Sequence, residues 1–553
     1  MKRTYVAAAG LLGLIALVLP VQQTASLLLG ATSPLRPAAG QGIWLFKLML
    51  LVHAGVVLAL GRFQKAPAGE PLVGLTLRDG EAWTRVTTGA VAALVLVGAW
   101  LRLHDLGTGL WFDEIQTLIS YVRRPLPEII AVYDSQNQHM LYSVLARVMF
   151  VTFGESAWAL RLPSVLFGLG SLVALYWFAS MIVSRREALL ATALLTFSYH
   201  HVWFSQNARG YTGLLFWTLL GSGLFLKLLA ERQRGWLTAA GYGLVMALAV
   251  YTHVLAVLAV AAHALIWGVL LARRGWREKN LSVWAPLVAL VLAGTMSLQL
   301  YALVLPQFLH TLLEPTMEGV ATQWKDPLWM LTETVRGLAR GLPGGLLAVT
   351  AAVAVCLTGV VSLARRSLAT AMMMILPGLL TAALLLSMEH NLWPRFFFFS
   401  AGFAVLIAVR GVLAIGQSVR PVRGSAVAVL ALSIVLLFSA ATVPAAWHPK
   451  QDYVSARDYV ERAKAPGDAV VTIDMSRYAY QRYVAPHFLG VESEAELDSI
   501  ERSHQRIWLL YTFPTRLAAV QPAIWSRVQR EYKTAAEFPG TVNGGAIVVK
   551  VRQ

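Results

Sequence analysis

The sequence predicts a polytopic α-helical membrane protein with about 13 transmembrane helices and a small C-terminal α/β domain on the external, periplasmic side. Apolar residues (AVILMFWYC) make up 57% of the 553 residues and charged residues only 14%, whereas about a quarter of the residues in a soluble domain are charged. Apolar runs of about 17–25 residues, the length that crosses a bilayer, recur along most of the chain. After residue 445 the pattern changes, and polar and apolar residues alternate at helix and strand spacing.

The apolar runs give the predicted spans in chain order. Their ends carry polar, basic, glycine or proline residues, as expected where a helix leaves the bilayer. The first run resembles a signal peptide, but no clear small-x-small cleavage site follows it, so we expect an uncleaved first helix. The predicted spans cover residues 5–20, 43–61, 88–103, 160–183, 187–204, 210–229, 236–254, 255–272, 282–305, 344–364, 368–387, 396–414 and 424–445.

The positive residues set the predicted orientation. The chain has 46 Lys and Arg against 29 Asp and Glu, a net charge of +17, and most of the positives fall in short loops on one side of the spans. The positive-inside rule places these loops and the N-terminus in the cytoplasm, and an odd number of spans then places the C-terminal end outside. We therefore expect a multi-pass protein of the cell inner membrane, surrounded by membrane lipids. Nucleic acid is not an expected partner, since no basic, aromatic-interleaved soluble domain is present.

Long loops and the change of pattern divide the chain. Two external loops, 104–159 and 306–343, are long enough to be functional. Within the first, the apolar stretch from His139 to Phe153 is short for a span and predicts a helix lying along the membrane. The predicted domains are an N-terminal pair of extra spans with a cytoplasmic loop (1–87), the main transmembrane domain (88–445) and a soluble external α/β domain (446–553).

The last domain is expected to be a small sheet with helices packed on it. It carries no phosphate-binding loop and no nucleophile elbow. The predicted elements are helices at 452–464, 494–504 and 516–536 and strands at 469–473, 506–511 and 546–551.

Two adjacent acids, Asp113 and Glu114, follow an aromatic pair at the external mouth of a predicted span. A carboxylate near a bilayer is costly, so one that is present usually has a function. Neighbouring residues on a helix point about 100° apart, so both acids cannot face one cavity equally. One arrangement has Asp113 as a catalytic base and Glu114 anchoring an arginine or an acceptor hydroxyl. The alternative is that Asp113 only caps a helix that runs to Tyr121.

Two basic clusters lie on the same side. Gln206, Asn207, Arg209 and Tyr211 form a donor-rich turn between two spans, and Arg395 opens a later helix. A guanidinium suits a phosphate because its planar fork donates paired hydrogen bonds and stays charged, and helix N-terminal amides add to this. The alternative for both clusters is a membrane-boundary anchor with snorkelling arginine and belt aromatics.

Other polar residues give weaker signals. His200 and His201 lack the i, i+4 spacing of a helical zinc site, and the one cysteine, Cys356, lies in an apolar run, so no metal site is predicted. Arg161 opens a span, and Glu155 is an alternative ion-pair partner for it.

Five short motifs follow one another on the predicted external side, and together they resemble glycosyltransferase family 39 of the GT-C superfamily. That family is related to the dolichyl-phosphate-mannose protein mannosyltransferases and the lipid A aminoarabinose transferases. The resemblance covers roughly residues 88–480 and makes 88–445 the GT-C transmembrane catalytic domain. The motifs are WFDE (111–114), QNQHMLY (136–142), RLPSVLFG (161–168), FSQNARGY (204–211) and RFFFF (395–399).

The resemblance implies transfer of a sugar from a polyprenyl-phosphate carrier to an acceptor at the external face. Asp113 would be the catalytic carboxylate with Glu114 beside it, and the residues near the donor would be His139, Arg209, Tyr211 and Arg395. Two departures from the family pattern occur: His139-Met140-Leu141 replaces the usual His-Pro-Pro, and Asn207 stands where an acid is common. The expected supporting residues are Asn137, Arg161, Gln206 and Asn207.

The chemistry agrees with these roles. An acceptor hydroxyl attacks the anomeric carbon, a carboxylate takes its proton, and the lipid phosphate leaves, so one base with direct displacement predicts inversion. A monophosphate needs less charge relief than a diphosphate, so no metal or other cofactor is required. The acceptor hydroxyl, on a lipid, a glycan or a protein, stays open. The alternatives are a lipid or glycan transporter, which favours internal repeats and mid-membrane charges, and an oligosaccharide polymerase or ligase.

Overall fold

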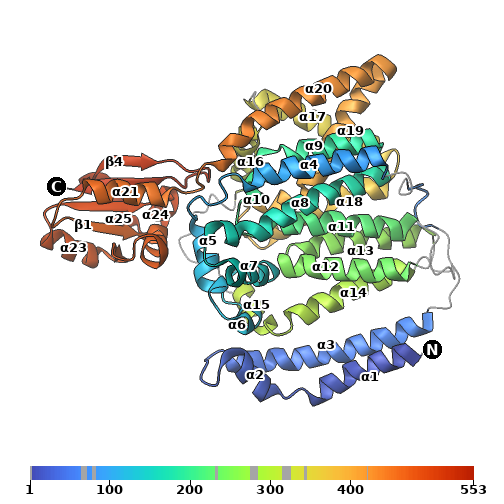
Figure 1. Ribbon diagram of the computed structural model, residues 1–553, viewed down its shortest axis with the longest axis horizontal. Coiled ribbons are helices and arrows are strands. Elements are labelled where there is room, and N and C mark those ends of the chain that lie inside the picture. Colours follow the sequence, from blue (N-terminus) through green and yellow to red (C-terminus); the bar gives the residue numbers. More distant parts are fainter. Residues whose placement is uncertain are drawn as a thin grey trace.

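The computed structural model describes residues 3–63, 71–77, 83–230, 235–274, 284–313, 326–341, 345–419 and 421–552. Helices stand side by side in one part of the molecule, and a small sheet with its own helices projects from one end of them (Figure 1). Residues 314–325 and 342–343 of the predicted loop 306–343 lie outside the described residues, as do parts of several predicted cytoplasmic loops. The predicted fold class, a polytopic helical protein with a C-terminal α/β region, is confirmed.

The helices before residue 446 follow the apolar runs. Short π- and 3₁₀-helical turns cover Leu118–Val122, Pro394–Ser400 and Val443–Trp447. The α-helices are α1 (Arg3–Val18), α2 (Val21–Leu29), α3 (Arg36–Phe63), α4 (Arg85–Leu103), α5 (Phe112–Thr117), α6 (Leu126–Ala131), α7 (Met140–Phe153), α8 (Ala157–Ile182), α9 (Arg185–Thr196), α10 (Tyr199–Ser205), α11 (Tyr211–Ala230), α12 (Trp236–Thr252), α13 (Ala256–Arg274), α14 (Trp284–Tyr301), α15 (Leu305–Leu313), α16 (Pro327–Gly341), α17 (Gly345–Ala364), α18 (Leu368–Ser387), α19 (Ala401–Val419) and α20 (Pro421–Thr442).

Within the described residues, 10 helices are long and apolar enough to cross a membrane, or up to 11 if α1 and α2, bent by 80°, form one span. The sequence predicts about 13, and two predicted spans account for the difference. The segment 187–204 forms two short helices because Ser198 starts a new helix, its hydroxyl accepting from the His201 amide at 3.4 Å. The segment 236–254 forms α12, an apolar helix below the length of the other spans.

Close helix packing is made by small residues in the bundle. Helices α8 and α11 are buried over most of their length. The backbones of α17 and α19 touch at Gly359 and Gly411, where a Cβ would overlap the carbonyl groups of Ile407 and Val355. Small residues allow such contacts between membrane helices, where van der Waals packing drives association.

The C-terminal α/β region (446–553) contains a five-stranded sheet in the order β2-β1-β3-β5-β4. Strands β1, β2 and β3 are parallel, whereas β5 is antiparallel to both β3 and β4. The strands are β1 (Ala469–Ile473), β2 (Leu489–Val491), β3 (Ile507–Tyr511), β4 (Lys533–Phe538) and β5 (Ile547–Arg552). Its helices are α21 (Tyr453–Ala463), α22 (Asp474–Ala479), α23 (Glu494–Ser503), α24 (Pro514–Val520) and α25 (Pro522–Glu531), with a π-helical turn at Tyr480–Val484.

Predictions for this region are confirmed for three strands and two helices, but the continuous helix at 516–536 is wrong. Pro522 starts a second helix, since a proline fits a first turn and breaks a helix interior. Lys533–Phe538 is then a strand, because pairing with β5 decides its conformation over a weak local preference. The sequence reading also missed β2 and α22.

The C-terminal α/β region packs on the end of the bundle that carries α5 and α7. One apolar cluster joins the two parts: Ile115, Leu118 and Tyr142 from the helical part lie with Tyr453 and Tyr480 from the C-terminal part. In Figure 1 the sheet region projects from this end, beside α5. The predicted carboxylates therefore lie where the two parts meet.

Candidate active site

Helix α5 presents its two acids in different ways. Trp111 is the N-cap residue, and the Glu114 Oε2 atom accepts a hydrogen bond from the Trp111 amide at 3.3 Å. Asp113 lies inside the first turn, so the alternative that Asp113 caps this helix is wrong. The α-helix ends at Thr117 and continues as a π-helical turn. Asp113 and Glu114 are consecutive in α5, so their side chains point about 100° apart.

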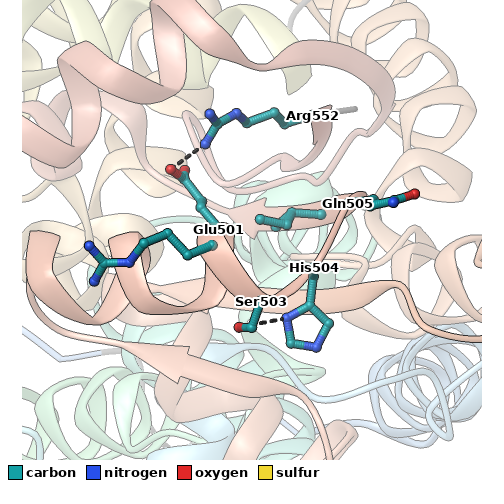
Figure 2. A pocket seen from close by; sticks show the side chains of 7 residues that line it. Glu501, Ser503, His504, Gln505 and Arg552 are labelled. Carbon is teal, nitrogen blue, oxygen red and sulfur yellow. Dashed lines mark hydrogen bonds and ion pairs between the residues drawn. The ribbon is translucent and has the colours of Figure 1, made fainter.

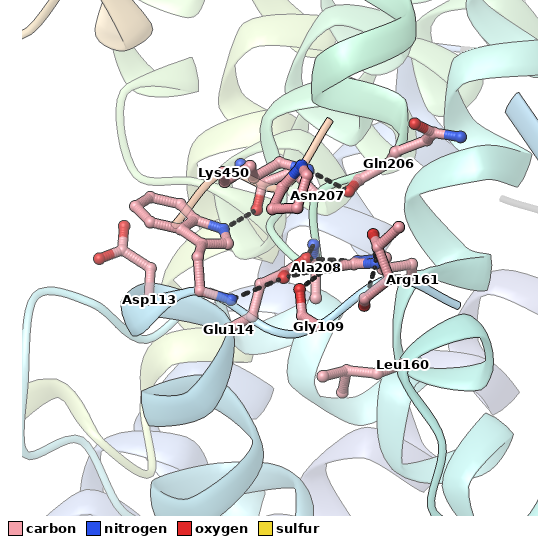
Figure 3. A network of polar contacts seen from close by, with 12 residues as sticks. Gly109, Asp113, Glu114, Leu160, Arg161, Gln206, Asn207, Ala208 and Lys450 are labelled. Atoms are coloured by element: carbon pink, nitrogen blue, oxygen red, sulfur yellow. Dashed lines mark hydrogen bonds and ion pairs between the residues drawn. The ribbon is translucent and has the colours of Figure 1, made fainter. Parts of the chain in front are cut away.

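Glu114 is fully buried and forms a two-pronged ion pair with Arg161. Its Oε1 atom accepts from Arg161 Nε at 2.8 Å and from the Ala208 amide at 2.7 Å, and its Oε2 atom accepts from Arg161 Nη2 at 2.6 Å (Figure 3). This confirms that Glu114 anchors an arginine. The alternative prediction, that Arg161 pairs with Glu155, is wrong, because Glu155 pairs with Arg123.

Arg161 uses its remaining hydrogens on the loop before α5. Nη1 donates to the carbonyls of Leu106 and Thr108, both at 2.9 Å, and Nη2 donates to that of Gly109 at 3.0 Å. The pair therefore ties three segments together: the loop before α5, the start of α8 and the turn before α11. Every oxygen of Glu114 is engaged, so this carboxylate is a structural anchor.

The charge state of Glu114 agrees with that role. Burial alone would raise the pKa of Glu114, but the charge and hydrogen bonds of Arg161 outweigh it and lower the pKa overall. Glu114 is therefore ionised at neutral pH, and its lowered pKa makes it a weak base.

The Asp113 carboxylate has fewer hydrogen-bond partners than that of Glu114. Its side chain is 12% exposed, and among the described residues its carboxylate has one hydrogen-bond partner, Arg395, at 3.3 Å between Oδ2 and Nη1. The Arg395 guanidinium lies 5.0 Å from the centre of the Trp393 ring. Two segments 282 residues apart thus bring a carboxylate and a guanidinium together at one end of the bundle.

The turn before α11 is held by its own polar residues. Gln206 Nε2 donates to the carbonyls of Arg102 and His104 at 3.1 and 2.5 Å. Asn207 Oδ1 accepts from the Trp111 indole at 3.0 Å. Both side chains are hydrogen-bonded to neighbouring backbone or aromatic groups, and these bonds fix the turn that carries Arg209.

Arg209 and His139 form the second half of the site. Arg209 Nη1 donates to the Asn137 carbonyl at 2.6 Å and to the Thr117 hydroxyl at 3.3 Å. His139 Nδ1 accepts from the Gly210 amide at 2.8 Å, while its Nε2 atom lies 3.1 Å from Arg209 Nη2.

Two hydrogen-bond donors face each other in this contact. Burial, and next the charge of Arg209, holds the pKa of His139 well below its ordinary value, so the ring is neutral. Because Nδ1 accepts a hydrogen bond, the ring proton is on Nε2, which therefore points at a guanidinium. An anionic oxygen would accept from both groups.

Three more buried donors of the candidate site lack a hydrogen-bond partner among the described residues. Among the described residues, the Arg209 Nε, Arg395 Nε and Asn137 Nδ2 atoms are buried and form no hydrogen bond. Buried polar groups are paired in nearly all proteins, and an exception is a reason to look for a ligand. Two of these donors belong to arginines predicted to meet the carrier phosphate, Arg209 and Arg395, and the third belongs to Asn137, predicted as a supporting residue.

An aromatic wall borders these residues. Tyr211 lies 5.3 Å from the His139 ring and 5.5 Å from the His253 ring, and His253 lies 6.4 Å from Phe396 (centre to centre). The wall joins α7, α11, the end of α12 and the turn that carries Arg395. All ten site residues predicted from the sequence therefore lie at this end of the bundle.

The sequence reading missed Lys450 and Gln451, which follow the last membrane helix. Lys450 Nζ donates to the Gln206 carbonyl at 2.6 Å and lies 5.0 Å from the Trp203 ring centre. Gln451 Oε1 accepts from the Phe112 amide at 3.0 Å. Their signal was a polar pair directly after an apolar run, but their partners are far away in sequence.

The buried Lys450 should make the free energy of unfolding depend on pH. Burial lowers the pKa of Lys450 to about 7, although the Glu114 carboxylate opposes the shift. The unfolded chain holds this proton up to a pKa of about 10.4, so between the two values it binds more protons than the folded chain, and the free energy of unfolding rises with pH. Between about pH 7 and about pH 9, wild type should gain stability over Lys450→Met by up to about 1.4 kcal/mol per pH unit.

Thermal unfolding of both proteins across this range measures the effect, with the exposed Lys533→Met as the control. The control should follow the wild-type curve. A gap between wild type and Lys450→Met that stays constant with pH would contradict the lowered pKa.

Among the described residues, no group of three or more His, Cys, Asp or Glu is placed to hold a metal ion. A cavity of about 510 Å³ lies on the C-terminal α/β region, lined by Glu501 and Arg552 (Figure 2). The Glu501 carboxylate there forms ion pairs with Arg527 and Arg552 and accepts a hydrogen bond from the Tyr532 hydroxyl, so it is not a candidate catalytic base.

Comparison with known proteins identifies a related sequence segment. Residues 138–301 match the family described as dolichyl-phosphate-mannose-protein mannosyltransferase. This segment contains His139, Arg161 and the turn with Arg209. The match supports, over this segment, the resemblance to a glycosyltransferase family predicted from the sequence. No curated protein matches the sequence.

Three solved structures align with this chain at low identity. ArnT from Cupriavidus metallidurans, in the apo state, aligns with 12% identity over 84% of this chain and 98% of its own, with a TM-score of 0.49. The Archaeoglobus fulgidus oligosaccharyltransferase aligns with 11% identity over 83% of this chain and 72% of its own, with a TM-score of 0.48. EmbB, an arabinosyltransferase from Mycobacterium smegmatis, aligns with 14% identity over 75% and 44%, with a TM-score of 0.40.

Proposed function

We propose that this protein transfers a sugar from a polyprenyl-phosphate carrier to an acceptor hydroxyl, with Asp113 as the catalytic base. One observation carries the proposal: the Asp113 carboxylate contacts Arg395, and among the described residues Arg395 and Arg209 each keep a buried Nε donor without a partner. A sugar phosphate needs both elements, a base for the incoming hydroxyl and cations for the departing phosphate. The family match over 138–301 supports the same chemistry.

The reaction is a single displacement at the anomeric carbon. The acceptor oxygen bonds to that carbon while Asp113 takes the hydroxyl proton. The bond from the carbon to the phosphate oxygen breaks, and its electron pair stays on the phosphate. Attack opposite the leaving group inverts the anomeric configuration.

Asp113 suits the base better than Glu114 does. Glu114 has both oxygens engaged and is completely buried, whereas Asp113 keeps some exposure and one partner. The Asp113–Arg395 contact at 3.3 Å holds the carboxylate next to the group that would meet the phosphate. A base and the charge-stabilising group are then within one small volume, as the displacement requires.

Arg209, Arg395 and His139 suit the phosphate. The donor-to-donor contact of His139 Nε2 with Arg209 Nη2 becomes favourable when a phosphate oxygen accepts from both. Tyr211 borders the same place, and Asn137 adds an unpartnered amide. The prenyl chain would then extend between the helices, and the residues assigned here need no metal ion to meet a monophosphate.

The placement in the cell belongs to the same proposal. We assign the protein to the inner membrane, with the N-terminus in the cytoplasm and the active site and the C-terminal α/β domain (446–553) outside. The helical catalytic domain (88–445) follows the extra helices of 1–87. The positive loops support this orientation, and the acceptor is a hydroxyl on a lipid, glycan or protein at the external face.

Carrier binding gives a direct test of the arginines. Replacing Arg209 or Arg395 by Gln should weaken the binding of sugar-free polyprenyl phosphate roughly 10- to 100-fold each, because a charged hydrogen bond to the phosphate is lost. Arg123→Gln is the control, since Arg123 forms a surface ion pair with Glu155 and should change binding little. Equal affinity in all four proteins would contradict the phosphate assignment.

The function itself is tested with a panel of purified polyprenyl-phosphate sugars. The wild-type protein should release polyprenyl phosphate from at least one donor when an acceptor is present, and the new glycosidic bond should have the inverted configuration. Retention would contradict the single displacement. Binding and movement of lipid across vesicles without any bond cleavage would instead support the transporter alternative.

A further inference from the structure

The linker between the membrane helices and the C-terminal α/β region contacts α5, the helix that carries Asp113. It begins after the 3₁₀ turn Val443–Trp447 and ends where α21 starts at Tyr453. Within it, Gln451 is 1% exposed and Lys450 5% exposed, although both are polar. A linker between two parts of a protein is usually exposed, so burial of these side chains is unusual.

Gln451 bridges the two parts with both ends of its amide. Its Oε1 atom accepts from the Phe112 amide at 3.0 Å, and its Nε2 atom donates to the Thr512 hydroxyl at 3.1 Å. Phe112 is the first residue of α5, and Thr512 directly follows β3. The side chain thus connects a sheet strand to the residue that precedes Asp113.

The Phe112 amide needs such a partner. The first amides of a helix have no carbonyl within the helix, and Trp111 provides no side-chain acceptor. Glu114 satisfies the Trp111 amide and Gln451 satisfies the next one. The orientation of the first turn of α5 therefore depends on a residue 339 positions away.

Further contacts hold the linker in place. Its backbone accepts from the amides of Thr541 and Val542, through Pro449 and Lys450, at 3.0 and 3.2 Å. On the other side of α5, the Phe112 ring lies 5.7 Å from the Tyr478 ring centre. Gln451 is therefore fixed by the C-terminal region before it meets α5.

The geometry points to Gln451 as a positioning residue that sets the direction of the Asp113 carboxylate, and so makes the C-terminal α/β region a part of the active site. This inference rests on the proposed function of Asp113. A rotation of the first turn of α5 would move Asp113 away from Arg395, which its carboxylate now meets at 3.3 Å. Misplacement of a catalytic group by about 1 Å can cost on the order of 100-fold in rate.

Three variants separate positioning from folding. Gln451→Leu removes both hydrogen bonds at similar size. Gln451→Glu keeps an acceptor for the Phe112 amide but loses the donation to Thr512 and adds a carboxylate near Asp113. Gln505→Leu is the matched control, an exposed glutamine on the far cavity of the same region.

Hydrogen exchange gives a readout that does not need activity. In Gln451→Leu the Phe112 amide should exchange at least about tenfold faster than in wild type, while β1 and β3 stay protected and show that the region is folded. Gln505→Leu should match wild type. If the Phe112 amide exchanges equally in wild type and Gln451→Leu, the inference is wrong, whether or not the protein transfers sugar.

Kinetics then test the link to catalysis. Gln451→Leu should lower kcat by roughly 10- to 100-fold with little change in the KM for the donor. Gln451→Glu should recover part of kcat, because its carboxylate can still accept the hydrogen bond from the Phe112 amide. Faster exchange with unchanged kcat would overturn the positioning role, and a wild type without transfer activity would instead refute the proposed function.

Discussion

Asp113→Asn should lower kcat by roughly 100- to 10,000-fold, the range expected when a general base is lost. Asparagine has nearly the same shape and can still accept a hydrogen bond from Arg395, so the local structure should persist. The carrier phosphate would be bound by arginines and not by Asp113, so the affinity for polyprenyl phosphate should remain close to that of wild type. Single-turnover transfer and equilibrium binding measure the two quantities separately.

The control for this variant is Asp105→Asn. Asp105 is exposed, lies in the loop before α5 and has a positive φ of 52°, a conformation that asparagine tolerates well. It should keep wild-type rates. A loss of carrier binding in Asp113→Asn equal to the loss of rate would contradict the assignment of Asp113 as base.

Glu114→Gln should destabilise the protein by about 3–5 kcal/mol, the largest stability effect that we expect from one conservative substitution. Arg161, 1% exposed, would keep its charge but lose the carboxylate that neutralises it. The turn with Ala208 and the loop with Gly109 would loosen together, because one ion pair holds both. Thermal or denaturant unfolding in detergent measures the change.

The surface pair Arg123–Glu155 provides the matched control. Its side chains are 41% and 34% exposed, so Glu155→Gln should change stability by no more than about 1 kcal/mol. A second variant, Glu114→Gln combined with Arg161→Met, removes the unpaired charge and should recover part of the loss. Equal effects of Glu114→Gln and Glu155→Gln would contradict the anchor role of Glu114.

Much of the fold can be predicted from the sequence because a membrane span is a local signal. An apolar run of sufficient length specifies a helix such as α8 or α11 without knowledge of its neighbours. The break between α9 and α10 was missed, since it depends on a single capping serine inside an apolar stretch. Strand β4 was also missed, because only its pairing with β5 makes it a strand.

The residues of the candidate site could also be predicted only in part. Asp113, Arg209 and Arg395 were predicted as a group because charged residues at the ends of membrane helices are few and costly. The sequence does not specify the partner of Glu114, and the alternative pairing of Arg161 with Glu155 is wrong, because sequence spacing does not report a contact between residues 47 positions apart. Gln451 could not be found, because nothing local marks a hydrogen bond to Phe112.

The two carboxylates show why geometry is needed to assign roles. In the sequence Asp113 and Glu114 are neighbours of the same chemistry. In the structure Arg161 and two backbone amides engage the Glu114 carboxylate, whereas among the described residues the Asp113 carboxylate has one hydrogen-bond partner, Arg395. Burial and partners, rather than residue type, distinguish the anchor from the proposed base.

The most direct test of the proposed mechanism is a single-turnover measurement with a purified polyprenyl-phosphate sugar and an acceptor, comparing wild type, Asp113→Asn and Asp105→Asn. We expect release of polyprenyl phosphate and formation of an inverted glycoside by wild type and Asp105→Asn, and a rate at least about 100-fold lower for Asp113→Asn with the carrier still bound. Equal rates in all three proteins would show that Asp113 does not accept the proton of the attacking hydroxyl.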